Sequence, residues 1–267
     1  MSVNKNKTRR LFMAMALGFG LFVTGCGNNN AKNGKSEEET KTAVAEASAK
    51  SETDESDPMN RKIDFDKLAD VNEDIYAWIY VPGTTIDYPV VQAVAEENTF
   101  EAAEVANEYY LRRDLNGNDS EFGTIYTEVY NEKDFSDPVT VMYGHTAFMD
   151  EIPEGKEMFS DLHHFEDASY LAENPYFYVY TPENTYKYEV FCANTFPDTY
   201  LLGNYAFQIP AVVQSFIEEL ESTMDANVNN DMDVDVNKDS KLLVLSTCVE
   251  VGGDTRYLVS AVPVETK

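Results

Sequence analysis

A β-hairpin near the C-terminus is the most strongly patterned part of the sequence. The apolar run 242–245 predicts a buried strand, and this strand ends at Cys248. Residues 252–254, two glycines and an aspartate, indicate a turn, after which the apolar residues 257–262 predict a second strand. In such a hairpin the side chain of Arg256 returns beside the thiol of Cys248. Because arginine keeps its proton at working pH, the pattern predicts a cysteine at a strand end with a permanent cation beside it.

A second strand-like run, upstream, ends in a histidine. Residues 139–143 predict a short strand, and Gly144 and His145 follow it directly. A cysteine thiolate is a nucleophile, an imidazole carries protons near neutral pH, and a guanidinium stabilises an oxyanion. If the strand ends that carry His145, Cys248 and Arg256 converge, the chain has the parts of a covalent catalyst.

With these residues in place, the chain resembles a sortase, one of the cysteine transpeptidases of Gram-positive cell envelopes, and the class B branch fits best. The Gly144-His145 pair, the Thr247-Cys248 pair and Arg256 carry the resemblance. It extends over most of residues 60–265 through further motifs in the same order: Asn72, Tyr76, Trp78 and Ile79; Pro82-Gly83-Thr84; Ile86-Asp87-Tyr88-Pro89-Val90; Met158-Phe159; Asn174-Pro175; and Tyr178-Val179-Tyr180-Thr181.

The resemblance implies a mainly β fold. We expect a closed sortase-type β-barrel with N-terminal helices and a helix in the long connection before the Cys strand. It also implies His145, Cys248 and Arg256 as the catalytic residues, and no cofactor. The residues that it implies for the substrate groove are Asn107, Leu111, Thr195, Tyr200 and Ser246.

The chemistry that these residues support is acyl transfer. Cys248 would attack the threonine carbonyl of a short sorting motif, and His145 would give a proton to the departing amine. Arg256 and backbone amides would stabilise the tetrahedral oxyanion. The resemblance implies surface proteins that carry the motif as substrates, and an amine of a peptidoglycan precursor or of a pilin as the acceptor. The motif itself is not readable, because the residue after the nucleophile, acidic in the best-known members, is Val249 here.

The charge balance argues against nucleic acid as a partner. The chain has 20 basic and 48 acidic residues, a formal net charge of -28, and phosphate repels such a chain. We interpret the acidity mainly as a means of solubility outside the cell, although it could also help to attract a cationic amine.

The N-terminus has the plan of an export signal. A basic segment, 1–10, precedes a short apolar run, 11–23, and the residues that end at Cys26 resemble a lipobox, which implies lipidation of Cys26. An uncleaved signal anchor is the alternative. Either anchor implies the extracellular face of the membrane of a Gram-positive cell. Residues 1–26 are then the signal or anchor, 27–60 a disordered acidic tether, and 61–267 the catalytic domain.

Several helices and strands follow from hydrophobic spacing. The expected helices cover 64–79, with a break near residue 71, a short stretch within 95–110, 158–172 and 211–220, and the expected strands include 86–91 and the hairpin 176–181 with 185–194.

Other residue types that could carry chemistry have simpler interpretations. Cys192 is expected to be a small buried hydrophobe, with a disulfide to Cys248 as the alternative. His163 and His164 are expected to be surface or hydrogen-bonded core residues. The acidic stretch 227–240 lacks the glycine and the final glutamate of an EF-hand loop, so a solvated turn is favoured over a calcium site.

Two other functions remain open at the level of sequence. A secreted cysteine protease would use the same two side chains, but papain-like enzymes place the cysteine before the histidine, and here His145 precedes Cys248. A non-catalytic surface lipoprotein would need no reactive thiol. Labelling of Cys248 by a thiol reagent separates an enzyme from a binding module, and incorporation of an amine separates a transferase from a protease.

Overall fold

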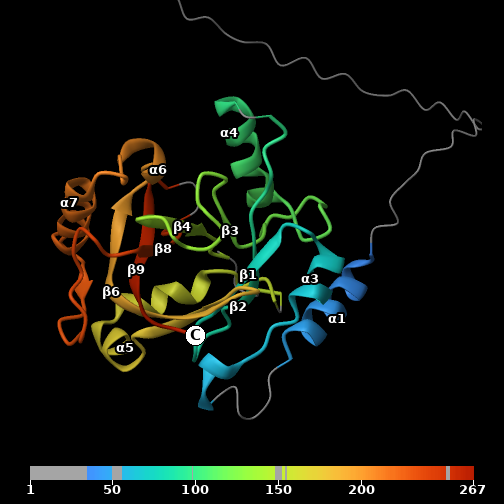
Figure 1. Ribbon diagram of the computed structural model, residues 1–267, viewed down its shortest axis with the longest axis horizontal. Coiled ribbons are helices and arrows are strands. Elements are labelled where there is room, and N and C mark those ends of the chain that lie inside the picture. The colour runs from blue at the N-terminus through green and yellow to red at the C-terminus, as the bar shows by residue number, and fades with distance from the viewer. Residues whose placement is uncertain (1–34, 50–55, 98, 148–151, 154, 251–252) are drawn as a thin grey trace, which may run out of the picture. The chain divides into compact units, whose positions relative to one another are not determined.

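The computed structural model describes residues 35–49, 56–97, 99–147, 152–153, 155–250 and 253–267. Its centre is one sheet that closes on itself in the order β5-β1-β2-β3-β4-β8-β9-β6, with β6 returning to β5 (Figure 1). A short ninth strand, β7, pairs with β6 beside the closed ring. The strands are β1 (Ile75–Tyr80), β2 (Asp87–Val91), β3 (Tyr126–Thr127), β4 (Val139–Tyr143), β5 (Tyr176–Tyr180), β6 (Thr185–Pro197), β7 (Asn227–Val228), β8 (Leu242–Cys248) and β9 (Thr255–Thr266). The predicted closed barrel is confirmed.

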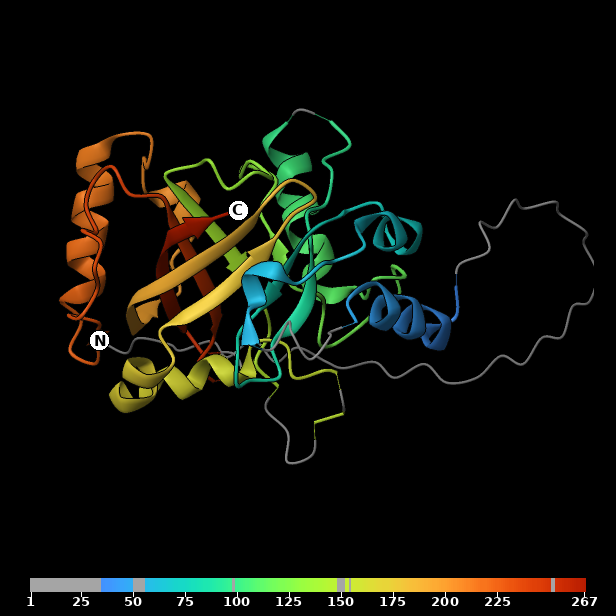
Figure 2. The same cartoon turned by 60° about the horizontal axis from the view of Figure 1, so that its bottom comes forward.

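Helices flank the barrel on different sides. In both Figure 1 and Figure 2, α7 lies on the side formed by β6, β8 and β9, while α1 and α3 lie beyond the opposite side. The helices are α1 (Glu37–Ala47), α3 (Phe65–Val71), α4 (Phe100–Tyr109), α5 (Ala168–Glu173), α6 (Leu201–Asn204) and α7 (Pro210–Glu221), with 3₁₀ turns η1 (Pro58–Asn60), η2 (Tyr110–Arg112) and η3 (Ser160–Glu166). Within the described residues, none of these is both long and apolar enough to cross a lipid bilayer.

Strand β8 is buried on both of its faces, and this explains its continuous apolar run. Leu243 and Leu245 belong to the cluster that fills the barrel interior. Leu242 and Val244 point the other way, into the cluster beneath α7. A strand covered on both sides has no polar face, so its sequence does not alternate.

The expected helix before the Cys strand is α7. Pro210 opens it at a position where the missing N–H costs nothing, and one side of the helix is buried against the barrel. Phe216 is fully buried and its ring contacts those of Phe196, Tyr205 and Phe207. The predicted helices near 95–110 and 158–172 are also present, as α4 and as η3 followed by α5.

The helix predicted for 64–79 is wrong in its second half. The chain is helical only as α3, and the stretch from Ile75 is the strand β1. Every residue of β1 is buried, because the strand lies between β2 and β5 with packed side chains on both faces. In a fully buried segment almost every position is apolar. Apolar residues at every third or fourth position therefore cannot distinguish a helix from a strand there.

Part of the stretch expected to be a disordered tether is helical and docked. Ser36 caps α1 through a capping box with Glu39. The hydroxyl of Thr40 donates to the Asn116 side chain at 2.6 Å, and Ala47 is buried in a cluster with Trp78. Composition predicted disorder because α1 has few large apolar residues, yet small side chains let it lie close to the barrel. Cys26 and the segment predicted to be an export signal lie outside the described residues.

A buried cation holds the chain that follows α1. The Arg61 guanidinium lies over the rings of Trp78, Tyr80 and Tyr180 at 5.4–5.7 Å from their centres, and it pairs with Asp87 at 2.6 Å. Its Nη2 also donates to the carbonyl of Ser48 at 2.7 Å. These contacts join the segment before the barrel to β1, β2 and β5.

Replacing Phe216 by Ala tests the contribution of α7. We expect a loss of about 3–5 kcal/mol in the free energy of unfolding, because the substitution removes a buried ring and leaves a cavity. Urea denaturation monitored by circular dichroism measures the loss. The control is Ser215→Ala, at the exposed neighbouring position, which should change stability by less than about 0.5 kcal/mol. Equal effects of the two substitutions would contradict this account of α7.

Candidate active site

Parallel pairing of β4 with β8 places His145 and the Cys strand at one edge of the barrel. In this pairing Tyr143 lies opposite Ser246, so both strands run out at the same end. The N–H of Gly144 donates to the Ser246 carbonyl at 3.2 Å and continues the ladder by one residue. A Cβ atom on Gly144 would lie 2.5–2.6 Å from Ile125 and Phe159, so only glycine fits at this close approach.

Antiparallel pairing of β8 with β9 brings Arg256 beside Cys248. The two residues are directly opposite in the register, as the hairpin predicted, and Phe196 of β6 lies opposite Arg256 on the other side. Residues opposite each other in a sheet share one face. Phe196 belongs to the cluster beneath α7, so Cys248 and Arg256 are on the outer face of the barrel and not inside it.

A groove of about 460 Å³ contains all three predicted catalytic residues. Its floor comes from strands β3, β4, β8 and β9, one wall from α4 and η2, and the other from the chain between β6 and α6. The lining residues are Glu104, Asn107, Glu108, Leu111, Tyr126, Glu128, Tyr143, Gly144, His145, Asp198, Thr199, Tyr200, Ser246, Thr247, Cys248 and Arg256.

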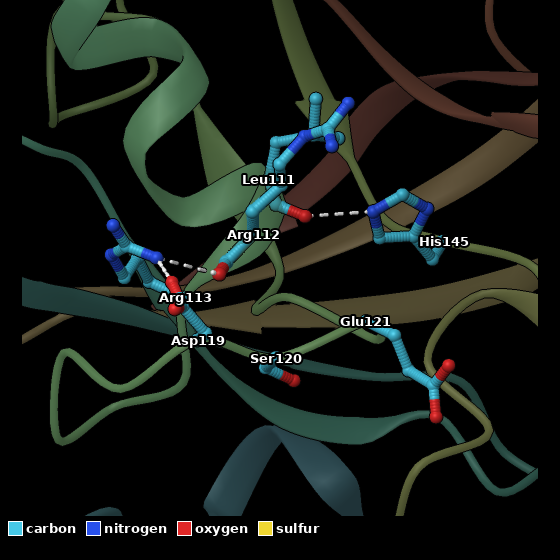
Figure 3. A pocket seen from close by; sticks show the side chains of 7 residues that line it. All are labelled: Leu111, Arg112, Arg113, Asp119, Ser120, Glu121 and His145. Atoms are coloured by element: carbon cyan, nitrogen blue, oxygen red, sulfur yellow. Dashed lines mark hydrogen bonds and ion pairs between the residues drawn. The ribbon is translucent and has the colours of Figure 1, made fainter. Parts of the chain in front are cut away.

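His145 lies between this groove and a second hollow. The second hollow, about 740 Å³, is also lined by Leu111, Arg112 and Arg113 (Figure 3). Nε2 of His145 is 2.8 Å from the carbonyl oxygen of Leu111. Since a carbonyl only accepts hydrogen bonds, Nε2 carries the hydrogen in this arrangement. The histidine is therefore held at the rim of the groove by backbone of the wall that faces the Cys strand.

Arg256 is oriented by a carboxylate, Asp198, that no sequence motif marks. Nη2 of Arg256 pairs with Asp198 at 2.6 Å, and Nη1 donates to the carbonyl of Thr255 at 3.1 Å. Asp198 directly follows β6, and its own N–H donates to the carbonyl of Asp254. No local motif marks Asp198, because its role depends on the β6–β9 register, which joins two segments 58 residues apart.

Four of the five expected groove residues line the groove. Asn107 and Leu111 are on the α4 and η2 wall, Ser246 is on the floor, and Tyr200 is on the opposite wall. The Asn107 side chain accepts from the N–H of Val129 at 2.8 Å, which leaves its NH₂ group for a ligand. The structure places these residues at the groove, and their contacts with substrate remain predictions.

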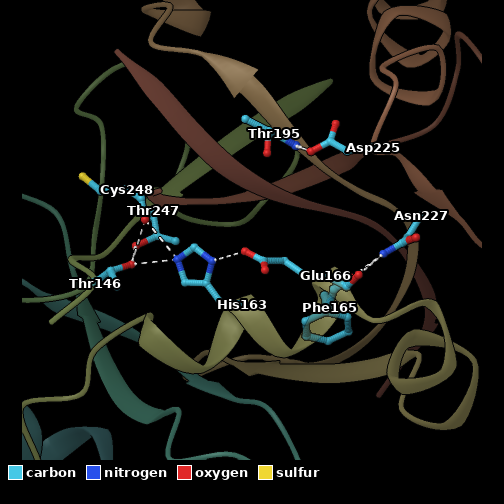
Figure 4. A network of polar contacts seen from close by, with 9 residues as sticks. All are labelled: Thr146, His163, Phe165, Glu166, Thr195, Asp225, Asn227, Thr247 and Cys248. Carbon is cyan, nitrogen blue, oxygen red and sulfur yellow. Dashed lines mark hydrogen bonds and ion pairs between the residues drawn. The ribbon is translucent and has the colours of Figure 1, made fainter. Parts of the chain in front are cut away.

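The expectation for Thr195 is wrong. Thr195 lies opposite Tyr257 in the β6–β9 register, and Tyr257 packs in the barrel interior. A period of two puts Thr195 on the inner face, whereas Cys248 is on the outer one. Its N–H donates to Asp225 at 3.0 Å, away from the thiol (Figure 4). Thr199, four residues later, lines the groove instead.

A buried carboxylate, Glu128, also lines the groove and was not predicted. The residue is 2% exposed, and its Oε1 accepts from the Tyr143 hydroxyl at 2.6 Å. Burial raises the pKa of the Glu128 carboxyl, and hydrogen bonds from Tyr143 and Tyr200 partly oppose this effect. Glu128 follows β3, a strand of only two residues, which leaves little pattern to read in the sequence.

The two cysteines in the described residues are both free, so the alternative of a disulfide between them is wrong. Cys192 is fully buried in the cluster beneath α7, as expected for a small hydrophobe. Burial raises the pKa of its thiol to about 12, so it is inert near neutral pH. Cys248 is partly exposed at the groove.

Comparison with known proteins agrees with this geometry. The family model of the sortase domain matches residues 79–264. The chain belongs to the sortase family. Sortase B of Listeria monocytogenes is 27% identical over 182 residues, 68% of this chain and 65% of that protein, and sortase B of Staphylococcus aureus is 25% identical over 193 residues, 72% of this chain and 70% of that protein. The match thus spans slightly less than two thirds of the Listeria protein.

Solved sortase structures share the fold. The crystal structure of sortase B from Clostridium perfringens superposes with a TM-score of 0.61 and 25% identity, covering 75% of this chain and all of that one. Since these relatives are class B sortases, the chain is a class B sortase-like protein. Within the described residues, no group of three or more His, Cys, Asp or Glu side chains is arranged to hold a metal ion.

The substitution Glu128→Gln tests how much the burial of the charged Glu128 carboxylate lowers the stability of the folded protein. An acid whose pKa is raised in the folded protein binds its proton more tightly there, so stability falls as pH rises above the ordinary value of 4.5. Glutamine keeps an oxygen for the Tyr143 hydroxyl and removes the charge. We therefore expect the variant to melt at a higher temperature than the wild type at pH 7, and the gain to disappear near pH 4.

The matched control for this prediction is Glu104→Gln. Glu104 lines the same groove but is exposed, so its substitution should give no gain that depends on pH. Thermal melts of both variants between pH 4 and pH 8 make the comparison. If the Glu128→Gln variant is less stable than the wild type at pH 7, burial of the Glu128 charge does not destabilise the protein, and this explanation is wrong.

Proposed function

We propose that this protein is a cysteine transpeptidase that cleaves a sorting motif in surface proteins and transfers them to an amine. The observation that carries the proposal is the position of Cys248 directly opposite Arg256, in a groove that His145 also lines. The three groups supply a nucleophile, an oxyanion stabiliser and a proton carrier on strands whose register fixes their order. Membership of the sortase family supports the same reaction.

The reaction has two halves. The thiolate of Cys248 attacks the scissile carbonyl, and the Arg256 guanidinium stabilises the resulting oxyanion. The tetrahedral intermediate collapses by breaking the C–N bond, and His145 gives a proton to the departing amine. An acceptor amine then attacks the thioester, the C–S bond breaks, and the thiolate leaves while the amine loses its proton to His145.

His145 and Arg256 each already contact another group of the protein, so each must also become available to the substrate during the reaction. The His145 proton is engaged by the Leu111 carbonyl, and the guanidinium is paired with Asp198. A planar guanidinium has five N–H donors, so Arg256 can keep Asp198 on one edge and turn another to an oxyanion. His145 has to exchange its backbone partner for the leaving group, and this requires a change of its side-chain torsion.

The groove suits a cationic acceptor. Two exposed glutamates, Glu104 and Glu108, line it together with Asp198, and the last of these is already paired with Arg256. Negative lining raises the local concentration of an ammonium group. A solved sortase B has been crystallised in complex with triglycine, and it shares this fold at 24% identity with a TM-score of 0.60. We propose an amine of the cell wall or of a pilus as the acceptor.

We further propose that the enzyme is anchored at the extracellular face of a Gram-positive membrane. The support is the sequence of residues 1–26, with its basic segment, short apolar run and Cys26. Mass spectrometry of the membrane fraction from expressing cells, with a search for a diacylglyceryl group on Cys26, distinguishes lipidation from an uncleaved anchor.

A peptide library with a mixture of amines tests the reaction. We expect mass spectrometry to find products in which the C-terminal part of a peptide has been replaced by an amine. Cys248→Ala should abolish them, whereas Cys192→Ala should retain them, because the Cys192 thiol is buried and protonated. Products formed only with water would indicate a protease, and turnover by Cys248→Ala would exclude the proposed mechanism.

Arg256→Ala tests the oxyanion role. Loss of one donor to a developing oxyanion lowers kcat by about 10²–10³-fold in other enzymes, and we expect a loss of this order. Arg113→Ala is the control, since Arg113 lies in the neighbouring hollow and pairs with Asp119. Steady-state kinetics on a peptide from the library measures both. A kcat for Arg256→Ala equal to that of the control would remove Arg256 from the chemistry.

A further inference from the structure

The carbonyl oxygen of Cys248 is held by two side chains from outside its own hairpin (Figure 4). Nε2 of His163 lies 3.0 Å from this oxygen, and the hydroxyl of Thr146 donates to it at 3.0 Å. The Thr146 hydroxyl is also 2.7 Å from the hydroxyl of Thr247. The carbonyl oxygen of Cys248, at the end of β8, is thus bonded both to the loop after β4 and to η3.

The hydrogen-bond partners of His163 define which of its nitrogens carry hydrogen. Nε2 faces the Cys248 carbonyl, which can only accept. Nδ1 faces a carboxylate oxygen of Glu166 at 2.7 Å, and an ionised carboxylate also only accepts. A hydrogen on Nε2 therefore holds the Cys248 carbonyl, while Glu166 holds the opposite side of the ring. The Thr146 hydroxyl lies 3.3 Å from the same Nε2, so the carbonyl, the hydroxyl and the ring form one polar cluster.

The position of the His163 ring is fixed by packing. The ring stacks on Tyr257 with centres 5.2 Å apart and planes inclined by 27°, and the side chain is only 22% exposed. Tyr257 is opposite Thr247 in the hairpin, next to Arg256. The turn η3 that carries His163 is anchored by the buried side chains of Leu162 and Phe165.

We propose that His163, with Thr146, positions the nucleophile by clamping the carbonyl of Cys248. The residues after Cys248 leave the sheet to form the turn, so the ladder of β8 gives no further support at that point. The hydrogen bonds from His163 and Thr146 provide this support in place of a neighbouring strand. In Figure 4 the sulfur of Cys248 points away from the His163 ring, so His163 acts on the backbone and not on the reacting atom.

This inference rests on the proposed function, because a nucleophile needs positioning only if Cys248 reacts. A fixed backbone keeps the sulfur aligned with the scissile carbonyl and with Arg256. Misplacement of a reacting group by about 1 Å can reduce a rate by about 100-fold. Binding of the peptide elsewhere in the groove is unaffected, so the clamp acts on kcat and not on KM.

Three variants separate positioning from stability. His163→Phe keeps a ring against Tyr257 and loses the donor, while His163→Gln keeps an N–H donor for the Cys248 carbonyl. His164→Phe is the matched control, because His164 is on the same turn but is exposed, with its ring against Tyr170. Steady-state transfer of an amine to a peptide from the library gives kcat and KM for each, and thermal melts report the fold.

We expect His163→Phe to lower kcat by about 10–100-fold with KM within about twofold of the wild type. His163→Gln should recover most of this loss, and His164→Phe should match the wild type. A folded His163→Phe variant with wild-type kcat would overturn the proposal. So would a loss that His163→Gln does not recover.

A spectroscopic measurement tests the clamp without activity. In the wild-type protein, ¹⁵N NMR of the histidine rings should show a hydrogen on Nε2 of His163, and Thr146→Val should leave it in place. A His163 ring whose Nε2 carries no hydrogen would overturn the clamp. If the wild type transfers no amine to any peptide, the proposed function fails, and the ring spectrum still decides whether the clamp exists.

Discussion

The pairing of β8 with β4 on one side and β9 on the other is the constraint on which the rest of the site depends. The parallel ladder brings the end of β4 and the end of β8 to one edge, so His145 and Cys248 emerge together. The antiparallel ladder places Arg256 opposite Cys248. These ladders are held by clusters on both faces of β8, and the reactive residues sit where the ladders stop. The buried part of β8 thus stabilises the barrel, and its last residue, Cys248, carries the reactive thiol.

The groove is lined by several carboxylates and by an arginine, Arg256. Four carboxylates line the groove that contains Cys248, yet the residue directly opposite the thiol is an arginine. The ion pair with Asp198 orients the guanidinium, and it also leaves less of the Asp198 charge to repel a thiolate. Burial of Glu128 favours its neutral form, because it raises the pKa of the carboxyl. Both effects limit the repulsion that a thiolate would otherwise experience from its surroundings.

The sequence predicted the parts of this structure that depend on local order along the chain. The hairpin of β8 and β9, the helix α7 and the barrel followed from apolar runs, turn residues and family motifs. Strand β1 was mistaken for helix, because burial on both faces removes the alternation that identifies a strand. Thr195 was placed at the groove, although its register puts it on the inner face.

Contacts between distant segments were the part that no pattern could predict. Asp198 reaches Arg256 across the β6–β9 ladder, and His163 reaches the Cys248 carbonyl from a turn 85 residues away. A lone histidine such as His163 gives no sign in the sequence of its neighbours in space, so the sequence predicts only a surface or hydrogen-bonded core residue. The docked helix α1 was missed because its small side chains resemble those of a linker.

The docking of α1 has a consequence for the proposed lipid anchor, because it shortens the free chain between Cys26 and the catalytic domain. If Cys26 carries the lipid, only residues 27–35 separate it from the cap of α1 at Ser36. Nine fully extended residues span at most about 30 Å, whereas the 34 residues of 27–60 could span roughly 115 Å. With the proposed lipid on Cys26, the docked α1 would therefore reduce the distance that the chain can span between the bilayer and the catalytic domain to about a quarter of the length of a free 27–60 segment.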